Sequence, residues 1–438
     1  MRISGLHIGK VFLTTAICML LLALVFGVVS ASIYIFPDFL KDNLGFISLR
    51  PMHVSAAMFW IILGATGCIY CVLEQGSTDK RIKRTGLIQW VLWVISIIGI
   101  MVSYCIKDFG GREYWEFNPI WALPISTAWV LFLINFYRLV KKISTWPVYI
   151  WMWLTGVVFF LFTFLENYLW LIPYFREHFI TDMTIQWKVN GSLVGSWNQI
   201  IYGTAIFLMD RILNNKSTGS SKLAFGLYFL GLFNLMFNWG HHIYTLPTEP
   251  YIRYIGYAVS MTEWVFFVKI VMTWRASLSI VQRNYHYFPY RFIMAADIWI
   301  FINMGQAILM SIPAINMYTH GTHITVAHAM GTTIGINTMI LLAACFTFFN
   351  IEEKSKYLNK IFWALQISLV IFWTSLNLAG VKKGIWQLSA HQESYSKMMD
   401  SLAPYFVTFG LAGIGLLLTL GTLGIVLLKS TSASTSNV

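Results

Sequence analysis

Apolar stretches long enough to cross a bilayer recur along the whole chain, separated by short polar segments. A helix of roughly 20 apolar residues spans the hydrocarbon core of a membrane. On this length criterion the pattern predicts about twelve membrane helices, over residues 10–35, 52–74, 86–106, 119–139, 147–174, 186–209, 223–246, 253–274, 291–312, 323–349, 360–381 and 403–429. No Ser/Pro-rich linker interrupts them, so we predict an all-α polytopic membrane protein in which residues 1–438 form a single transmembrane domain.

Composition and charge favour a membrane protein over a soluble or nucleic-acid-binding one. Hydrophobic residues make up 57% of the chain and charged residues only 11%, which is too apolar for a soluble surface. The formal net charge of +12 comes from basic residues that gather in alternate loops, such as 78–84, 137–142 and 210–222. By the positive-inside rule these loops and both termini would be cytoplasmic. We therefore expect a lipid bilayer around the chain and no nucleic acid.

Four of the ten histidines fall at a similar depth in the predicted helices. They are His53 at the start of the second helix, His241 and His242 near the outer end of the seventh, and His328 early in the tenth. Ionisable side chains are rare inside membranes and usually mark functional sites. Their common depth therefore predicts ligands of metals or haems rather than scattered core histidines.

Helical spacing divides these candidate ligands between cofactors. Adjacent residues are about 100° apart on an α-helix, so His241 and His242 can both lean toward one metal. His328 and Met330 are two residues apart, about 200°, and point to opposite faces. We expect His328 to bind one haem, and Met330, with His53 on another helix, to bind a second. The simplest arrangement is two haems flanking one helix, with a non-haem metal facing one of them.

The motifs around these residues resemble those of the large subunit of bacterial nitric oxide reductases, within the haem–copper oxidase superfamily. The resemblance covers nearly the whole chain. It rests on "RPMHVSAAMFWIILGATGCIY" (50–70), "GREYWEFN" (111–118), "GHHIYTLPTEPYIRYIGYAVSMTEWVFF" (240–267) and "YTHGTHITVAHAMGTTIG" (318–335). It implies the fold of haem–copper oxidase subunit I. The HPExY pattern that is typical of the oxygen-reducing branch does not occur in the sequence.

The resemblance also implies two b-type haems, one non-haem metal that is usually iron, and a calcium ion. His328 would be the proximal ligand of the high-spin haem. His53 would be an axial ligand of the low-spin haem, and Arg50 would face a propionate. His241 and His242 would be two of the three histidines on the non-haem metal. The carboxylates that it implies are Glu263 near that metal, and Glu113 and Glu116 beside the calcium ion.

One departure from the family pattern concerns the low-spin haem. The family has a histidine two residues after the proximal ligand, and this chain has Met330 there. A His/Met pair raises the reduction potential relative to a bis-His pair, as it does in cytochromes c. The resemblance therefore implies a low-spin haem that is a poorer onward electron donor.

A second departure concerns the third histidine on the non-haem metal. The family motif is W-x-x-H-x-x-x-E-G-x-W-E, where this chain reads "WKVNGSLVGSWNQ" (187–199). Aligning the tryptophans and the glycine places Asn190 at the histidine, Val194 at the first glutamate and Asn198 at the second. A register shifted by one residue would instead place there Gly191, Gly195 and Gln199.

Either register removes one imidazole and both carboxylates from the metal site. Two imidazoles would hold the metal, with Asn190 Oδ1 as a weak third ligand, and the best proton carriers would be lost. Glu263 and Asn190 remain as candidate catalytic side chains. We expect Lys188 to extend to the outer surface, with a role near the metal as the alternative.

Three functions are compatible with these residues. The first is NO reduction in denitrification, in which two NO, two electrons and two protons give nitrous oxide and water. A cytochrome c or a quinol would donate the electrons, and a partner subunit or a second copy of the chain is also expected. The second is NO dismutation to N2 and O2, which needs no net electrons or protons and is proposed for relatives with altered metal ligands. The third is a non-catalytic descendant that binds haem or gas.

Overall fold

The computed structural model describes residues 7–42, 44–75, 77–260, 264–351, 355–389 and 393–435. Contacts divide the chain into two units. The first contains the chain up to Thr15 together with Ile61–Tyr290, and the second contains Ala16–Trp60 together with the chain from Arg291 onward. The helices α1 (Ile8–Ser32) and α2 (Gly45–Leu73) contribute one part to each unit. The units are described separately below.

Ten helices in the described part of the chain are long and apolar enough to cross a membrane, which confirms the predicted all-α membrane class. Two of the predicted spans are not among the ten. The predicted span 186–209 lies within α7 (Phe179–Leu213), a longer helix that also contains Lys188 and several buried amides. The predicted span 253–274 is divided between α9 (Pro250–Ser260) and α10 (Trp264–Ser277), and residues 261–263 lie outside the described residues.

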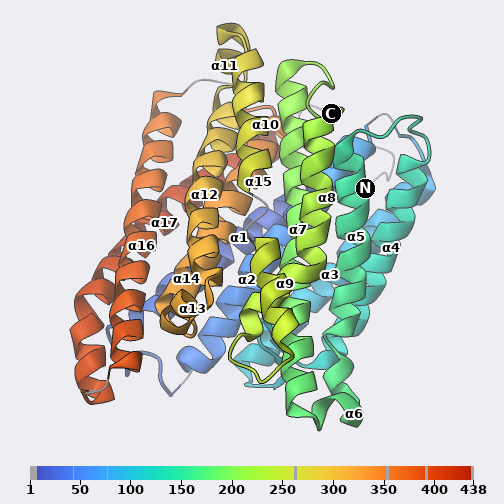
Figure 1. The fold of residues 1–438 in the computed structure, drawn as a ribbon. Coiled ribbons are helices and arrows are strands. Elements are labelled where there is room, and N and C mark those ends of the chain that lie inside the picture. Colours follow the sequence, from blue (N-terminus) through green and yellow to red (C-terminus); the bar gives the residue numbers. More distant parts are fainter. Residues whose placement is uncertain are drawn as a thin grey trace. The chain divides into compact units, whose positions relative to one another are not determined.

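The first unit is built on apolar helices that pack through aromatic rings and close backbone contacts. Its long helices are α3 (Lys80–Cys105), α4 (Ala122–Val140), α5 (Val148–Glu166), α7 and α8 (Lys222–Phe237). Figure 1 shows α5, α7 and α8 side by side, and the three pack against one another. Trp129 of α4 stacks on Phe160 of α5 with ring centroids 4.0 Å apart. Trp153 of α5 donates to the carbonyl of Ile200 on α7 at 3.1 Å.

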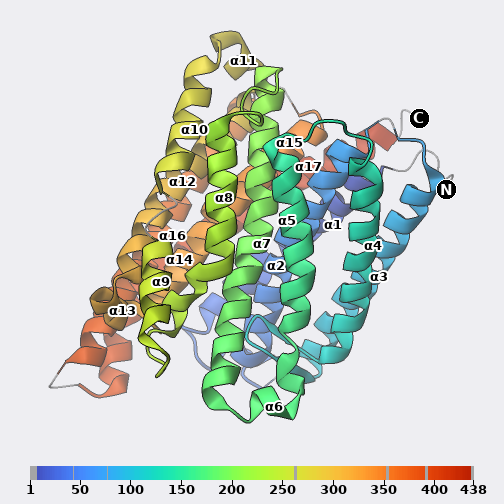
Figure 2. The same cartoon turned by 45° about the vertical axis from the view of Figure 1, so that its right-hand side comes forward.

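Glycines bring α7 close to α8 and to η4 (Asn238–Ile243), the 3-10 helix that follows α8. A Cβ added at Gly191 would lie 3.1 Å from Trp239 Cβ, and one added at Gly195 would lie 3.1 Å from Leu235. A Cβ at Gly231 of α8 would lie 2.6 Å from the Gln199 side-chain nitrogen. These contacts are spaced four residues apart and run in opposite directions along the two chains, so α7 and α8 are antiparallel (Figure 2).

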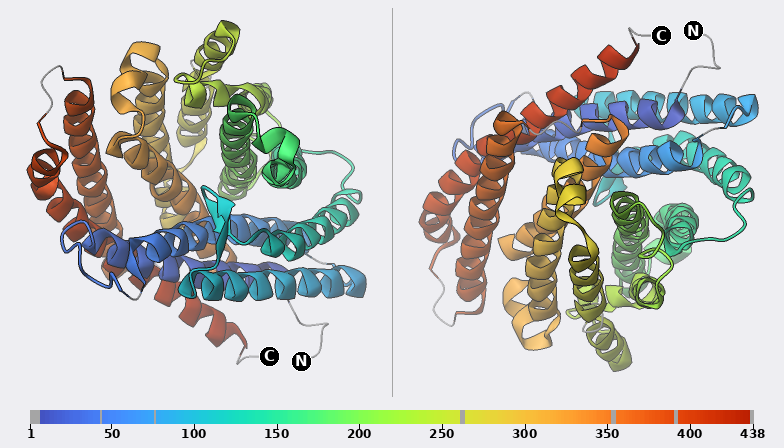
Figure 3. Two further views of the ribbon diagram at one scale, coloured as in Figure 1. Left: turned by 90° about the horizontal axis from the view of Figure 1, so that it is seen from below. Right: turned by 90° about the horizontal axis from the view of Figure 1, so that it is seen from above.

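A short hairpin and several short helices complete the first unit. The strands β1 (Phe109–Arg112) and β2 (Trp115–Phe117) are antiparallel and form the small hairpin visible in Figure 3. Tyr114 in its turn has a φ of 71°, in the left-handed region that tight turns require. The short helices are η2 (Pro119–Trp121), η3 (Leu169–Leu171), α6 (Pro173–Arg176) and α11 (Ile280–Tyr285).

Besides its parts of α1 and α2, the second unit contains most of α12 (Tyr287–Ser311) and the helices that follow it. These are α13 (Pro313–Thr319), α14 (His323–Met330), η5 (Gly331–Thr338), α15 (Met339–Phe348), α16 (Lys356–Leu388) and α17 (Tyr395–Thr435). The helices α16 and α17 form a long pair, and α14 packs against α16. η5 is a π-helix, and Trp60 of α2 donates to Thr338 at its end at 2.9 Å.

Candidate functional site

His53 has the surroundings that an axial haem ligand requires. Its Nδ1 lies 2.8 Å from the Ala23 carbonyl oxygen on α1. A carbonyl only accepts, so this bond places the proton on Nδ1 and leaves Nε2 to bind a metal, as in many metal-ligating histidines. Gly27 allows the close approach, because a Cβ there would lie 2.8 Å from the His53 ring. Arg50 lies three residues earlier on the same side of α2. These residues fit the predicted haem site.

His328 and Met330 both lie within α14, so the helical spacing that directs them to opposite faces applies. The Thr333 hydroxyl donates to the Ala329 carbonyl at 2.9 Å and lies 3.9 Å from the Met330 sulfur. A Cβ at Gly331 would come 2.2 Å from Asn303 Oδ1 on α12, so a larger residue at that position would displace the Asn303 amide. The π-helix η5 begins at this residue, and π-helical turns often occur at functional sites.

His241 and His242 lie in η4, and this changes the predicted geometry of the pair. We predicted α-helical spacing, whereas η4 is a 3-10 helix, in which adjacent residues are about 120° apart. The reason is that α8 ends at Phe237, before the histidines. The two rings nevertheless lie together, with centroids 4.2 Å apart and planes at 46°.

The turn of α7 that contacts this pair contains Trp187 and Gly191, and Asn190 directly precedes Gly191. Trp187 stacks on His242 with ring centroids 5.6 Å apart and planes at 11°. A Cβ at Gly191 would lie 3.9 Å from His242 Cδ2, so this turn of α7 packs against the histidine. Asn190 is 7% exposed, and neither its Oδ1 nor its Nδ2 has a hydrogen-bond partner among the described residues. A buried amide without partners is costly, so this side chain fits a metal ligand.

The two possible alignments of α7 with the family motif put the histidine position at Asn190 or at Gly191, and these positions have different neighbours. A side chain at Gly191 would begin 3.1 Å from Trp239 Cβ, which leaves little room for an imidazole. The Cβ direction of Gly191 thus points toward Trp239 and His242, and the side chain of Asn190 leaves the helix about 100° away from it. Among the described residues, no group of three or more His, Cys, Asp or Glu could hold a metal ion. Glu263, the expected carboxylate, lies outside the described residues.

The hairpin contains the two glutamates that were expected beside calcium. Glu113 lies in the turn and Glu116 lies in β2, and both are half-buried. Arg112 anchors the hairpin to α7, because it donates to both carboxylate oxygens of Asp182, at 2.7 and 3.0 Å. Calcium prefers six to eight oxygen ligands, and two glutamates supply only part of such a set.

Comparisons with known proteins establish the family of the chain. Residues 7–415 match the family described as cytochrome c and quinol oxidase polypeptide I. The chain belongs to this family. Its members are haem–copper oxidase subunit I proteins, which are integral membrane oxidoreductases that bind haem and a metal.

Relatives from two branches of this family are similar to the chain. It is 23% identical to a nitric oxide reductase subunit of Stutzerimonas stutzeri, over 96% of this chain and 94% of that protein. It is also 23% identical to cytochrome c oxidase subunit 1 of Rhodobacter capsulatus, over 86% of this chain and 75% of that protein. A cryo-EM structure of a haem–copper terminal oxidase dimer has the same fold, with a TM-score of 0.72 and 13% identity over 98% of this chain and 84% of that one.

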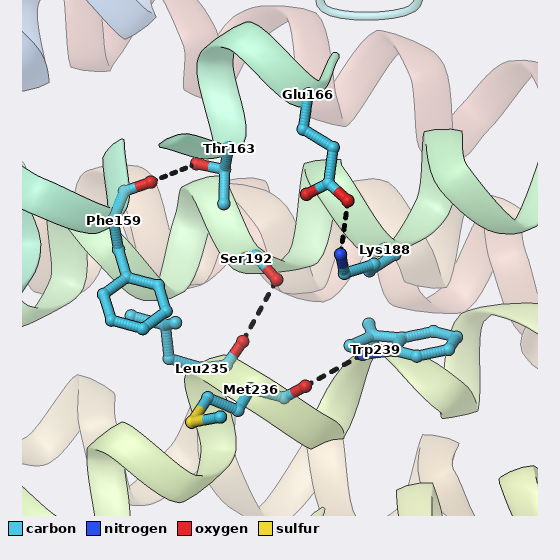
Figure 4. A network of polar contacts seen from close by, with 8 residues as sticks. All are labelled: Phe159, Thr163, Glu166, Lys188, Ser192, Leu235, Met236 and Trp239. Atoms are coloured by element: carbon cyan, nitrogen blue, oxygen red, sulfur yellow. Dashed lines mark hydrogen bonds and ion pairs between the residues drawn. The ribbon is translucent and has the colours of Figure 1, made fainter. Parts of the chain in front are cut away.

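One ion pair in this haem–copper oxidase subunit was not predicted from the sequence. Lys188 of α7 pairs with Glu166 at the end of α5, as Figure 4 shows. Their side chains are 35% and 15% exposed, so Lys188 reaches the carboxylate rather than extending only to the outer surface. The signal for it was Glu166 itself, the single charged residue of the apolar stretch that forms α5. The same view shows Ser192 donating to the Leu235 carbonyl at 3.1 Å.

Proposed function

We propose that this haem–copper oxidase subunit acts on nitric oxide and joins two NO molecules into nitrous oxide. The observation that supports it is the pair His241–His242, packed against the turn of α7 that contains the buried, unpartnered Asn190. Two imidazoles and an amide oxygen can hold a divalent metal and leave positions for a substrate. The similarity to a nitric oxide reductase subunit over 96% of the chain also favours this chemistry.

The bound cofactors would supply sites for NO and electrons for its reduction. The chain's own residues hold and orient those sites. His328 would bind the high-spin haem, and His53 and Met330 the low-spin haem, with the His53 ring fixed by the Ala23 carbonyl. His241, His242 and Asn190 would bind the non-haem metal, which we propose to be iron. Holding two NO molecules side by side makes N–N bond formation effectively intramolecular.

The remaining cofactors, the electron donor and the membrane location are proposed from the same resemblance. We propose two b-type haems, a calcium ion near Glu113 and Glu116, and a cytochrome c or quinol as electron donor. The site would lie in a bacterial inner membrane with both termini cytoplasmic. A partner subunit or a homodimer is also proposed, and the similar solved oxidase is a dimer. Pyridine haemochrome spectra of the purified protein would count the haems. A protein without haem would contradict both NO reduction and NO dismutation.

NO dismutation is the second candidate, and one observation favours it. The α7 positions that match the family's two glutamates are Val194 and Asn198, which cannot carry protons as carboxylic acids do. Dismutation of two NO to N2 and O2 consumes no protons and no external electrons. The lack of carboxylates at positions 194 and 198 should therefore slow dismutation less than it slows reduction.

Isotope-labelled NO separates the two reactions. Purified protein is given 15N-labelled NO with and without a reductant, and the gases are measured by mass spectrometry. Nitrous oxide that forms only with reductant supports reduction, whereas labelled N2 with O2 and no reductant supports dismutation. The variant His242→Ala is the control, because it should lose the non-haem metal and either activity. Haem-containing protein that forms neither gas would support the non-catalytic alternative.

A further inference from the structure

Arg291 connects α12 to α16 at the end where both helices begin. Its guanidinium donates to the side-chain oxygen of Asn359, in the first turn of α16. It also lies over two rings of that helix, 4.4 Å from the centroid of Phe362 and 5.1 Å from the centroid of Trp363. Both helices are long and apolar enough to cross a membrane, so these helix ends lie near its surface. The contacts therefore fix a guanidinium near the membrane surface, between two helices.

Two lysines lie on the face of α16 that carries this contact. Along that face, the spacing i, i+3, i+4 and i+7 is occupied by Lys356, Asn359, Lys360 and Trp363. Both lysines are exposed, and the Trp363 side chain is 54% exposed. We call Arg291, Lys356, Lys360 and Trp363 the cationic patch. The patch gathers three cations at the first two turns of α16.

The charge of the patch is positive even when the neighbouring sequence is counted. Its three cations contribute +3, and residues 352–354, which read Glu-Glu-Lys, contribute −1. The net charge is +2, and residues 352–354 lie outside the described residues. An anion is therefore the complementary partner of the patch.

The same face of α16 continues as an apolar stripe. Four, seven and eight residues after Trp363, the side chains of Ile367, Val370 and Ile371 are 59%, 49% and 44% exposed. α16 is one continuous helix over these positions, so the cations and the apolar side chains share one face. A free anion would use only the cations. A molecule with a charged head and hydrocarbon chains would use the whole face.

An anionic phospholipid has this chemistry. Guanidinium and ammonium groups form charge-assisted hydrogen bonds to phosphate oxygens. Tryptophan is enriched at the level of lipid headgroups, and lysine stems pack along apolar surface while their charges reach the headgroups. Basic pockets between membrane helices bind anionic headgroups. The patch and the stripe together therefore match the head and the chains of one lipid.

We propose that the cationic patch binds the phosphate of an anionic phospholipid, whose acyl chains lie along Ile367, Val370 and Ile371. Arg291 belongs to α12 and the two lysines belong to α16, so the bound lipid would hold these helices together. Such binding would stabilise the second unit, and it needs neither NO nor turnover.

Native mass spectrometry measures the lipid directly. The full-length, haem-loaded protein is titrated in detergent with phosphatidylglycerol or with phosphatidylcholine of the same chains, and the bound lipids are counted. Of the two, only phosphatidylglycerol has a net negative charge. We expect one phosphatidylglycerol to bind at least about tenfold more tightly than any phosphatidylcholine, because the basic residues attract the anionic headgroup.

Variants connect this lipid to the patch. The double variant Lys356→Gln, Lys360→Gln should bind it about thirtyfold more weakly, because two basic residues near the headgroup are lost. Both lysines are exposed, so the variant should fold. The control is Lys141→Gln, Lys142→Gln, which removes two exposed charges at the end of α4 and should leave the lipid bound. Equal losses in both variants, or equal binding of the two lipids to the unmodified protein, would overturn the site.

Inorganic phosphate distinguishes a lipid from a free anion. Phosphate has no acyl chains, so at the same concentration it should not displace phosphatidylglycerol, and displacement would overturn the lipid site. Phosphatidylglycerol should also raise the unfolding temperature of the unmodified protein, because a ligand that binds only the folded state stabilises it. The variant Lys356→Gln, Lys360→Gln should lose this increase, and an increase of the same size in that variant would contradict binding at the patch.

Discussion

Trp187 and His242 lie face to face, with ring centroids 5.6 Å apart and ring planes within 11° of parallel. The tryptophan comes from α7 and the histidine from η4, so the stack joins the two elements to which we assign the proposed metal site. Stacking restricts rotation of the imidazole about its side-chain bonds. Under the proposed function Trp187 is a positioning residue, because it would orient the imidazole of His242 without binding the metal itself.

Removing the stack should weaken metal binding while the fold and both haems remain. We expect Trp187→Leu to lower the content of non-haem metal, because His242 can then rotate, whereas Trp187→Phe should retain most of it. Elemental analysis of purified protein, expressed as metal per haem, gives the measurement. Trp129→Phe, in the stack with Phe160, is the control and should leave the metal content unchanged. Full metal content in Trp187→Leu would show that the stack does not orient the ligand.

The sequence predicted the membrane helices and located the histidines, but it did not predict the contacts that surround those histidines. Apolar runs and histidines are local signals, so ten of the predicted spans and the pair His241–His242 could be found directly. The 3-10 geometry of that pair depends on where α8 ends, which hydropathy does not report. The Lys188–Glu166 pair joins residues on two helices, so it follows from helix packing and not from any local pattern.

Restoring a histidine at position 190 should strengthen the metal site. An imidazole is a better ligand for iron, copper or zinc than an amide, so Asn190→His should bind the metal more tightly by on the order of tenfold, about 1.4 kcal/mol. Competition with a chelator measures the change. Gly191→His is the matched variant, and its side chain would start 3.1 Å from Trp239 Cβ. This variant should therefore be less stable than the unmodified protein and should bind the metal no more tightly. The opposite ranking would support the shifted alignment.

Breaking the Lys188–Glu166 pair should destabilise the first unit more than loss of a surface ion pair would. Glu166 is 15% exposed, so Glu166→Gln leaves the Lys188 charge in a partly buried position. We expect a loss of about 1–2 kcal/mol, between the values for surface and buried pairs. Thermal unfolding in detergent measures this loss of stability. The single variant Lys188→Met and the double variant with Glu166→Gln complete a double-mutant cycle. A coupling energy near zero in that cycle would mean that the pair adds no stability.

Met330 should set the potential of the low-spin haem. A thioether ligand favours the reduced iron more than a second imidazole does. Met330→His should therefore lower the potential by on the order of 0.1 V, within the range of about 0.8 V that axial ligands span. Potentiometric titration followed by optical spectra gives the value. Met339→Leu is the control, because the Met339 sulfur accepts from Gln366 at 3.4 Å and lies outside the predicted ligand set. An unchanged potential in Met330→His would show that His53 pairs with some other ligand, and the predicted weakness of this haem as an onward donor would fall with it.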